Sequence, residues 1–240
     1  MKDAPEHAPM PAPPPVTGDG FSVRSCRGLQ GCPHAAVVPD DPQGLSRRVA
    51  DALEALDLGR GLRRLHGREL RHHEAFTISI SCCPNACSRP QIEDAGFIGA
   101  ARPMLDAAAC TACGACLETC RERALIHGPR GGIEDLDRLS CVSCGACAGV
   151  CPAGALAIGS TGFRILAGGR LGRHPRLAED LSGPTMSRLL DPERAPEAAS
   201  ALARLLLDQG RPGERLADVL ERLPRGVAAK ALKATLDKAP

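Results

Sequence analysis

The chain has 240 residues, and its thirteen cysteines are the side chains best suited to carry out chemistry. Eight of them form two copies of one motif, C-x2-C-x2-C-x3-C. The first copy runs from Cys110 to Cys120, and the second runs from Cys141 to Cys151. Because the spacing is the same at every step, the two copies indicate an internal duplication.

Thiolates at this spacing favour iron–sulfur clusters. A loop with C-x2-C-x2-C binds three corners of a [4Fe-4S] cubane, and in two-cluster ferredoxins the last cysteine of each motif binds the other cluster. We therefore expect two clusters, one held by Cys110, Cys113, Cys116 and Cys151 and the other by Cys141, Cys144, Cys147 and Cys120. A pair of zinc knuckles is the weaker alternative, because zinc motifs combine two separated cysteine pairs. The segment resembles bacterial two-cluster ferredoxins.

Four further cysteines form two separated pairs. Cys26 and Cys32 make a C-x5-C pair, and Cys83 and Cys87 make a C-x3-C pair. Spacing alone leaves a zinc ion and a third cubane equally open, because both are bound by paired cysteines. The thirteenth cysteine, Cys82, is expected to be a small buried side chain, with a role as an alternate ligand less favoured.

The composition excludes several classes of function. A net charge of +2, no Trp, no Tyr and four Phe argue against a nucleic-acid-binding protein. No apolar run reaches the roughly 18 residues of a membrane helix. The first residues do not resemble a secretory signal, so we expect a cytoplasmic protein in a reducing compartment, where metal binding is favoured over disulfides.

The cysteine motifs need elements that position them. An extended piece at 21–23 leads to Cys26, and alternating apolar residues predict a strand at 76–80 that runs directly into Cys82. Helical spacing from Leu45 to Leu56 predicts a helix that Gly59 ends. The remaining expected elements are a disordered Pro-rich tail over 1–20, strands at 96–99 and 163–166, and amphipathic helices at 196–207, 214–223 and 227–236.

Residues 80–89, 93–99 and 168–176, with the first cysteine pair, resemble the iron–sulfur half-domain of siroheme sulfite and nitrite reductases. A ferredoxin module between the second and third stretches is the arrangement of the dissimilatory and anaerobic sulfite reductase branch. The resemblance implies an α+β fold with a mixed sheet. It divides the chain into a tail (1–20), a siroheme/4Fe-4S half-domain (21–103 and 161–190), an inserted 2[4Fe-4S] ferredoxin domain (104–160) and C-terminal helices (191–240).

The resemblance also implies a site. Cys26, Cys32, Cys83 and Cys87 would hold a third [4Fe-4S] cluster, and Cys87 would bridge it to the siroheme iron. The residues expected beside the siroheme are Asn85, Cys87, Arg89, Gly169, Arg170, Gly172 and Arg176. Siroheme carries eight carboxylates, for which arginine is the natural partner. The implied activity is reduction of sulfite or nitrite with electrons that arrive through the ferredoxin module.

Two departures favour an alternative, a non-catalytic electron-transfer protein that has lost siroheme. The family's Lys-Phe-Lys pattern stands here as Ala75-Phe76-Thr77, and a Pro-rich tail takes the place of a longer N-terminal region. Reduction of an anion requires cations and proton donors at the substrate. Candidate catalytic residues are Arg71, His72 and His73, for which a solvated helix face is the other interpretation.

The expected partners follow from this activity. They are an electron-donor protein or reductase subunit, a small inorganic anion as substrate, and a second copy or another subunit that completes the pocket. Neither nucleic acid nor a membrane is expected to be a partner.

Overall fold

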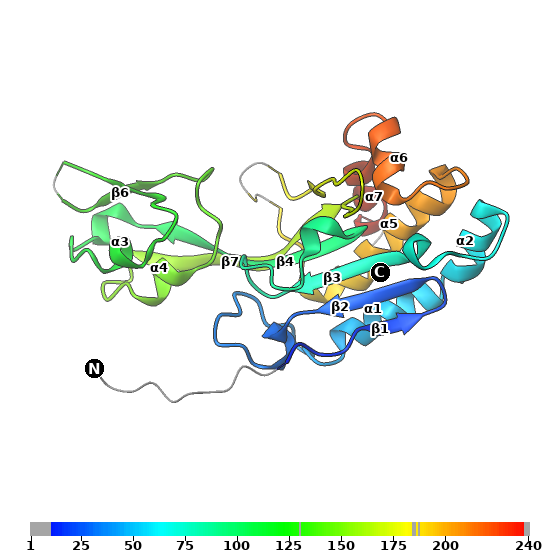
Figure 1. Cartoon of the computed structure of the whole chain (residues 1–240). Helices are drawn as coiled ribbons and strands as arrows, with labels where there is room; N and C mark the ends of the chain where they lie inside the picture. The colour runs from blue at the N-terminus through cyan, green and yellow to red at the C-terminus, as the bar shows by residue number, and fades with distance from the viewer. Residues whose placement is uncertain (1–10, 130, 184–185, 187, 238–240) are drawn as a thin grey trace.

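The computed structural model describes residues 11–129, 131–183, 186 and 188–237. Its main sheet has six strands in the order β1-β2-β3-β4-β7-β8, and a separate sheet contains β5 and β6 (Figure 1). The strands are β1 (Val16–Gly18), β2 (Phe21–Ser25), β3 (Phe76–Ser81), β4 (Ala95–Leu105), β5 (Leu125–His127), β6 (Ile133–Leu136), β7 (Leu156–Ala167) and β8 (Glu179–Asp180). The α-helices are α1 (Leu45–Glu54), α2 (Leu58–His66), α3 (Ala115–Thr119), α4 (Ala146–Gly149), α5 (Ala195–Gln209), α6 (Leu216–Arg222) and α7 (Val227–Leu236).

The main sheet is mixed, so the chain has an α+β fold, as the resemblance implied. Strands β2, β3 and β4 are parallel to one another, and the remaining pairs, β1–β2, β4–β7 and β7–β8, are antiparallel. In the register of β2 and β3, Ser25 lies opposite Ile80. The segments that follow these two strands therefore leave the same edge of the sheet, where they come together.

The alternation of apolar and polar side chains along β3 explains its place in the middle of the sheet. Phe76, Ile78 and Ile80 are all buried in the main hydrophobic core, as the alternating apolar pattern predicts. On the other face, Ser79 and Ser81 are also buried, because the segment between β3 and β4 covers them. The half-buried strand expected from the sequence is thus covered on both faces.

Helices from both ends of the chain pack against this sheet. Helix α1 buries Leu45, Val49 and Leu53 completely, and it contacts β1, β2 and the long C-terminal helix α5. Helices α6 and α7 pack on α5, where Leu216 and Leu232 join the same core. The C-terminal helices are therefore part of the main core of this chain.

The boundaries differ from the expected ones at two places. Helix α1 ends at Glu54, and Gly59 lies inside α2 instead of ending a helix. A Cβ atom at residue 59 would lie 2.2 Å from the Cγ of Asp19, so the glycine serves close packing. Strand β1 occupies residues that were expected to be a disordered tail; residues 1–10 of that tail lie outside the described part.

A second lobe is carried by the two longest strands. Strands β4 and β7 pair from Ala95↔Ala167 to Leu105↔Leu156, so they extend from the main sheet into the lobe that holds α3, α4, β5 and β6 (Figure 1). Both strands are longer than the pieces expected at 96–99 and 163–166. The lobe has its own small core, which includes Leu125, Leu136 and Leu156.

Candidate functional site

Five cysteines from two distant segments line one cavity at the edge of the main sheet where β2 and β3 end. The cavity has a volume of about 300 Å³, and its cysteines are Cys26, Cys32, Cys82, Cys83 and Cys87. Cys26 directly follows β2, and Cys82 and Cys83 directly follow β3. The parallel pairing of these strands therefore brings the C-x5-C and C-x3-C pairs together.

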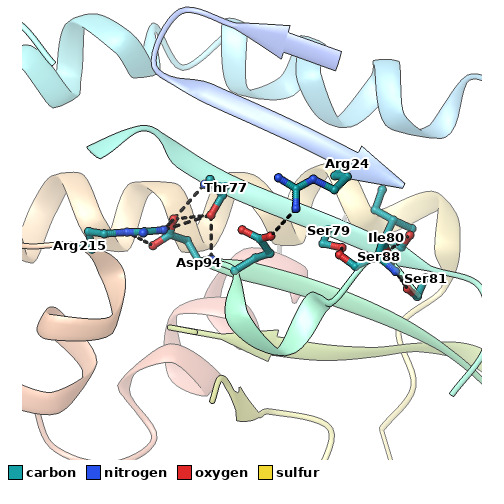
Figure 2. Close-up of polar contacts among 9 residues, drawn as sticks. Arg24, Thr77, Ser79, Ile80, Ser81, Ser88, Asp94 and Arg215 are labelled. Carbon is teal, nitrogen blue, oxygen red and sulfur yellow. Dashed lines mark hydrogen bonds and ion pairs between the residues drawn. The ribbon is translucent and has the colours of Figure 1, made fainter. Parts of the chain in front are cut away.

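A polar network holds the loop that carries Cys83 and Cys87. The backbone carbonyl of Ser88 accepts a 2.7 Å hydrogen bond from Ser79 Oγ, and the Ser88 hydroxyl lies 2.7 Å from Ser81 Oγ (Figure 2). Ser88 Oγ also donates to the carbonyl of Ile80. The loop is thus fastened back onto β3, because the polar face of that strand supplies its partners.

The backbone of this loop adopts conformations that are rare for residues with a side chain. Ala86 has φ 51° and Arg89 has φ 61°, both in the left-handed region. Strain of this kind is found where the surrounding structure needs an unusual backbone path, often at functional sites. Here it turns the chain sharply between Cys83 and Arg89.

The sulfur atoms of Cys26 and Cys87 accept hydrogen bonds from nearby N–H groups. Cys26 Sγ accepts from the backbone N–H groups of Gly28 at 3.2 Å and Cys82 at 3.3 Å. A hydrogen bond with the Cys82 thiol, together with these N–H groups, lowers the pKa of Cys26 to about 6. Cys87 Sγ accepts from Asn85 Nδ2 at 3.0 Å, whereas burial raises the pKa of Cys83. Donors of this kind stabilise thiolate, the form that binds metals.

Three arginines give the same cavity positive charge. Arg24, Arg27 and Arg89 line it together with the cysteines. The carboxylate of Glu93, which is buried, accepts a 3.1 Å hydrogen bond from Arg24 Nη1 and fixes that side chain (Figure 2). The site can therefore hold metal through its thiolates and attract an anionic group through its arginines.

One wall of the cavity comes from the Pro-rich segment. Ala12, Pro13 and Pro15 line it, whereas Pro14 is not among the lining residues. The cause is the antiparallel pairing of β1 with β2, in which Val16 lies opposite Val23, so residues before Val16 run alongside the residues that lead to Cys26. The turn at residues 18–20 could have revealed this hairpin, but the prolines concealed it.

The structure places the expected siroheme-contacting residues in two groups. Asn85, Cys87 and Arg89 are exposed on the loop beside the cavity. Gly169, Arg170, Gly172 and Arg176 belong to the loop that follows β7. There Arg170 forms an ion pair with Asp218 of α6, and Arg176 donates to the carbonyl of Ala217. Arg170 and Arg176 are thus held by the C-terminal helices, and none of the four residues lines the cysteine cavity.

The candidate catalytic residues lie elsewhere. Arg71, His72 and His73 are all exposed, just before the start of β3, whereas the cysteines follow the end of that strand. Their turn is fixed by Glu74, whose buried carboxylate accepts from Arg71 N at 2.8 Å. The Arg68 guanidinium, followed by the Arg71 N–H, lowers the pKa of Glu74 to about 2. The structure does not bring these three residues to the cavity.

In the second lobe, the eight repeated cysteines line two further cavities. One is lined by Cys110, Cys113, Cys116 and Cys151, and the other by Cys120, Cys141, Cys144 and Cys147. Each cavity therefore takes three cysteines from one motif and the last cysteine from the other. Burial raises the pKa of Cys116, and it raises the pKa of Cys147 to about 11.

The two motifs have almost the same backbone shape. The residues before the second cysteine of each motif, Ala112 and Ser143, both have φ 57°, and the glycines after it, Gly114 and Gly145, have φ 79° and 76°. Such alternating conformations direct successive backbone N–H groups into a concave site. The duplication seen in the sequence is therefore also a duplication of local structure.

The donor sets fit [4Fe-4S] clusters better than single ions. Each of the three cavities is lined by at least four cysteines, and four thiolates are the ligand set of a [4Fe-4S] cluster. In the described part of the chain, no group of three or more His, Cys, Asp or Glu side chains could hold one metal ion.

Comparisons with known proteins agree with this donor chemistry. The family model described as "Nitrite and sulphite reductase 4Fe-4S domain" matches residues 23–232. The "Coenzyme F420-dependent sulfite reductase" of Methanocaldococcus jannaschii is 44% identical over 50 residues, which are 21% of this chain and 8% of that protein. One subunit of the anaerobic sulfite reductase of Salmonella typhimurium is 29% identical over 106 residues, which are 44% of this chain and 26% of that protein.

The fold has a counterpart among solved structures. The crystal structure of dissimilatory sulfite reductase I (DsrI) matches with a TM-score of 0.53 and 17% identity, over 91% of this chain and 53% of that one. The matched segments thus span about half or less of the length of the two relatives and of the chain in the DsrI crystal structure. Among the described residues, none of the helices has the length and apolar content needed to span a bilayer.

Proposed function

The chain belongs to the nitrite and sulphite reductase 4Fe-4S domain family, and on that basis we propose that it is the iron–sulfur subunit of a siroheme-dependent enzyme that reduces sulfite or nitrite. As a family member it is an iron–sulfur protein with at least one [4Fe-4S] cluster. Siroheme would supply the iron at which the anion is reduced. The compartment we propose is the reducing cytoplasm.

The convergence of Cys26, Cys32, Cys83 and Cys87 on one cavity carries the proposal. These four residues would hold the cluster, and Cys87 is the member that is exposed and therefore able to reach a second group. Arg24, Arg27 and Arg89 would pair with carboxylates of the macrocycle or with the anionic substrate. Asn85 would orient the Cys87 sulfur through the hydrogen bond already described.

We also propose that the second lobe is an inserted ferredoxin module with two clusters. The two cavities with exchanged fourth cysteines support this interpretation, since two-cluster ferredoxins share that exchange. Backbone donors reach the sulfurs here too, from Ile133 N to Cys110 Sγ and from Leu156 N to Cys151 Sγ, both at 3.4 Å. In this arrangement an electron-donor protein would dock on the second lobe.

A partner is part of the proposal. The cavity volume of about 300 Å³ is at the lower limit for small-molecule sites, so most of a macrocycle would lie outside it. We propose that this exposed part is covered by a second copy or by another subunit, which supplies further groups for the substrate. Arg71, His72 and His73 remain candidates only for such an intersubunit surface, because they lie away from the cavity.

One observation favours the alternative, an electron-transfer protein without siroheme. Arg170 and Arg176 are engaged by α6 through Asp218 and the Ala217 carbonyl, with Glu221 at 3.6 Å from Arg170 Nη2. These arginines would have to leave such partners in order to pair with a macrocycle. The two functions therefore differ in whether the chain binds siroheme.

A visible spectrum with iron and sulfide analysis of the anaerobically purified chain tests the proposal. Three cubanes and one siroheme give about thirteen iron atoms per chain, together with the absorption bands of siroheme. About twelve iron atoms without those bands would support the electron-transfer protein. A chain that binds zinc, or no iron, would contradict both functions.

The exchanged ligands make Cys151→Ser a test of the second lobe. We expect this variant to lose the EPR signal that is also lost in Cys113→Ser, although Cys151 belongs to the other motif. Cys120→Ser should instead lose the signal that is lost in Cys144→Ser. If Cys151→Ser and Cys144→Ser affect the same cluster, the ligands are not exchanged.

The Pro-rich wall gives a third test. A glutamate at residue 13 or 15 would introduce a carboxylate beside the cavity arginines and disturb the wall, so we expect iron to be released to a chelator about fivefold faster, a change that corresponds to about 1 kcal/mol. Pro14→Glu is the matched control, because residue 14 does not line the cavity. Equal release rates in all three variants would show that the wall does not protect the site.

A further inference from the structure

Cys82 is the fifth cysteine of a cavity in which a cubane needs only four thiolates. It directly precedes Cys83, but its surroundings are different. Cys82 is completely buried and belongs to the main hydrophobic core, whereas Cys83 is partly exposed and Cys87 is exposed.

The backbone of Cys82 is fixed from several sides. Its carbonyl accepts hydrogen bonds from Ala36 N at 2.8 Å and Val37 N at 3.0 Å. A Cβ at residue 99 would lie 2.2 Å from the same carbonyl oxygen, so Gly99 of β4 allows the close approach of this strand. The backbone of Cys82 is therefore held in one position beside the four other cysteines.

The groups that Cys82 directs at the quartet are hydrogen-bond donors. Its backbone N–H donates to Cys26 Sγ at 3.3 Å. Its thiol lies near the same sulfur, because a Cβ at residue 28 would come within 2.6 Å of Cys82 Sγ and 3.0 Å of Cys26 Sγ. The N–H of Gly28 donates to that sulfur as well, at 3.2 Å. Two backbone donors thus reach Cys26 Sγ, one of them from Cys82, and the Cys82 thiol lies beside the same sulfur.

Gly28 makes room for this arrangement. A Cβ at residue 28 would lie 2.3 Å from Cys82 Cβ, 2.6 Å from Cys82 Sγ and 3.0 Å from Cys26 Sγ. Real Cβ atoms do not approach other atoms so closely, so a side chain at residue 28 would displace Cys82. The absence of a side chain here and the position of the buried thiol depend on each other.

We propose that Cys82 is a positioning residue which holds the Cys26 thiolate by hydrogen bonds and is not itself a cluster ligand. The inference rests on the proposed function, since it needs a cluster at Cys26, Cys32, Cys83 and Cys87. Hydrogen bonds to ligand sulfurs stabilise the more negative, reduced state of a cluster and raise its reduction potential. Cys82 therefore adjusts the potential of this cluster.

The test compares Cys82→Ala and Cys82→Ser in the full chain, purified anaerobically. The cluster is identified by the EPR signal that Cys83→Ala lacks, and a redox titration follows that signal. Cys82→Ala should keep the iron content of the wild type but show a lower midpoint potential and altered g values. Cys82→Ser keeps a donor, so its potential should lie between those of the wild type and Cys82→Ala.

Gly28→Ala provides a second route to the same change, because it displaces Cys82 without removing the thiol. We expect its potential to shift in the same direction as that of Cys82→Ala. If Cys82→Ala loses about four iron atoms, as Cys83→Ala does, Cys82 is a ligand and the inference is wrong. An unchanged potential and EPR spectrum in Cys82→Ala would also overturn it. A wild-type chain without the Cys83-dependent signal would instead contradict the proposed function.

Discussion

Cys83→Ala should remove about four of the iron atoms that the chain binds, while the two clusters proposed for the second lobe remain. Cys83 lines the cavity of the main sheet. The two cavities of the second lobe share no cysteine with that cavity. Loss of one thiolate leaves one iron atom of the cubane without a protein ligand, so we expect the whole cluster to be lost. The siroheme absorption and the reductase activity that we propose for this chain should disappear with this cluster. Iron analysis, the visible spectrum and turnover with a chemical reductant measure these losses.

Cys87→Ser is the matched comparison, because Cys87 is the proposed bridge. We expect it to abolish the siroheme bands even where some cluster iron is retained, since serine oxygen is a poor substitute for a bridging sulfur. Cys113→Ser in the other lobe should leave the siroheme bands intact. Siroheme bands that survive unchanged in Cys87→Ser would show that the bridging assignment is wrong.

Among substitutions that break an ion pair of the main sheet, Arg215→Ala should cause the largest loss of stability. Arg215 Nη2 lies 2.5 Å from Asp94 Oδ2, and it also donates to Thr77 Oγ1 at 3.1 Å (Figure 2). The Asp94 side chain is only 1% exposed and that of Arg215 is 21% exposed. Removal of the arginine leaves a buried carboxylate without its cation, at a cost of about 2–4 kcal/mol, somewhat below that of a fully buried pair.

Thermal unfolding under anaerobic conditions measures this loss. For a chain of this size we expect Tm to fall by about 4–16 °C. Adding Asp94→Asn to Arg215→Ala should recover part of the loss, because an amide needs no cation. Arg173→Ala, in an exposed loop, should change stability by less than about 0.5 kcal/mol. If the double variant is no more stable than Arg215→Ala, an unpaired charge is not the cause.

Local patterns predicted the elements of this fold well. The alternating residues of 76–80 form β3, and the last amphipathic segment forms α7 with the expected bounds, Val227–Leu236. The helix from Leu45 is also confirmed, but the expectation that Gly59 ends it is wrong, because glycine can serve close packing as well as helix termination. A single sequence does not distinguish these two uses.

The candidate site was less accessible to sequence reasoning. Motif spacing singled out twelve of the thirteen cysteines that line the three cavities, and their role as ligands stays a prediction. The contributions of Pro13, Glu93 and Cys82 depend on strand pairing and on contacts between distant segments, which spacing does not encode. The same holds for Arg170, whose ion pair with Asp218 joins two regions far apart in the chain.

The junction between the two lobes bears on how such a chain could arise. Strands β4 and β7 are antiparallel neighbours, so the lobe between them begins and ends at adjacent points, Leu105 and Leu156. A short turn at the same place would close β4 and β7 into an ordinary hairpin without altering the main sheet. The lobe could therefore have been gained, exchanged or lost in one genetic step, and an ancestor with a simple hairpin here would have kept the entire cysteine-lined cavity.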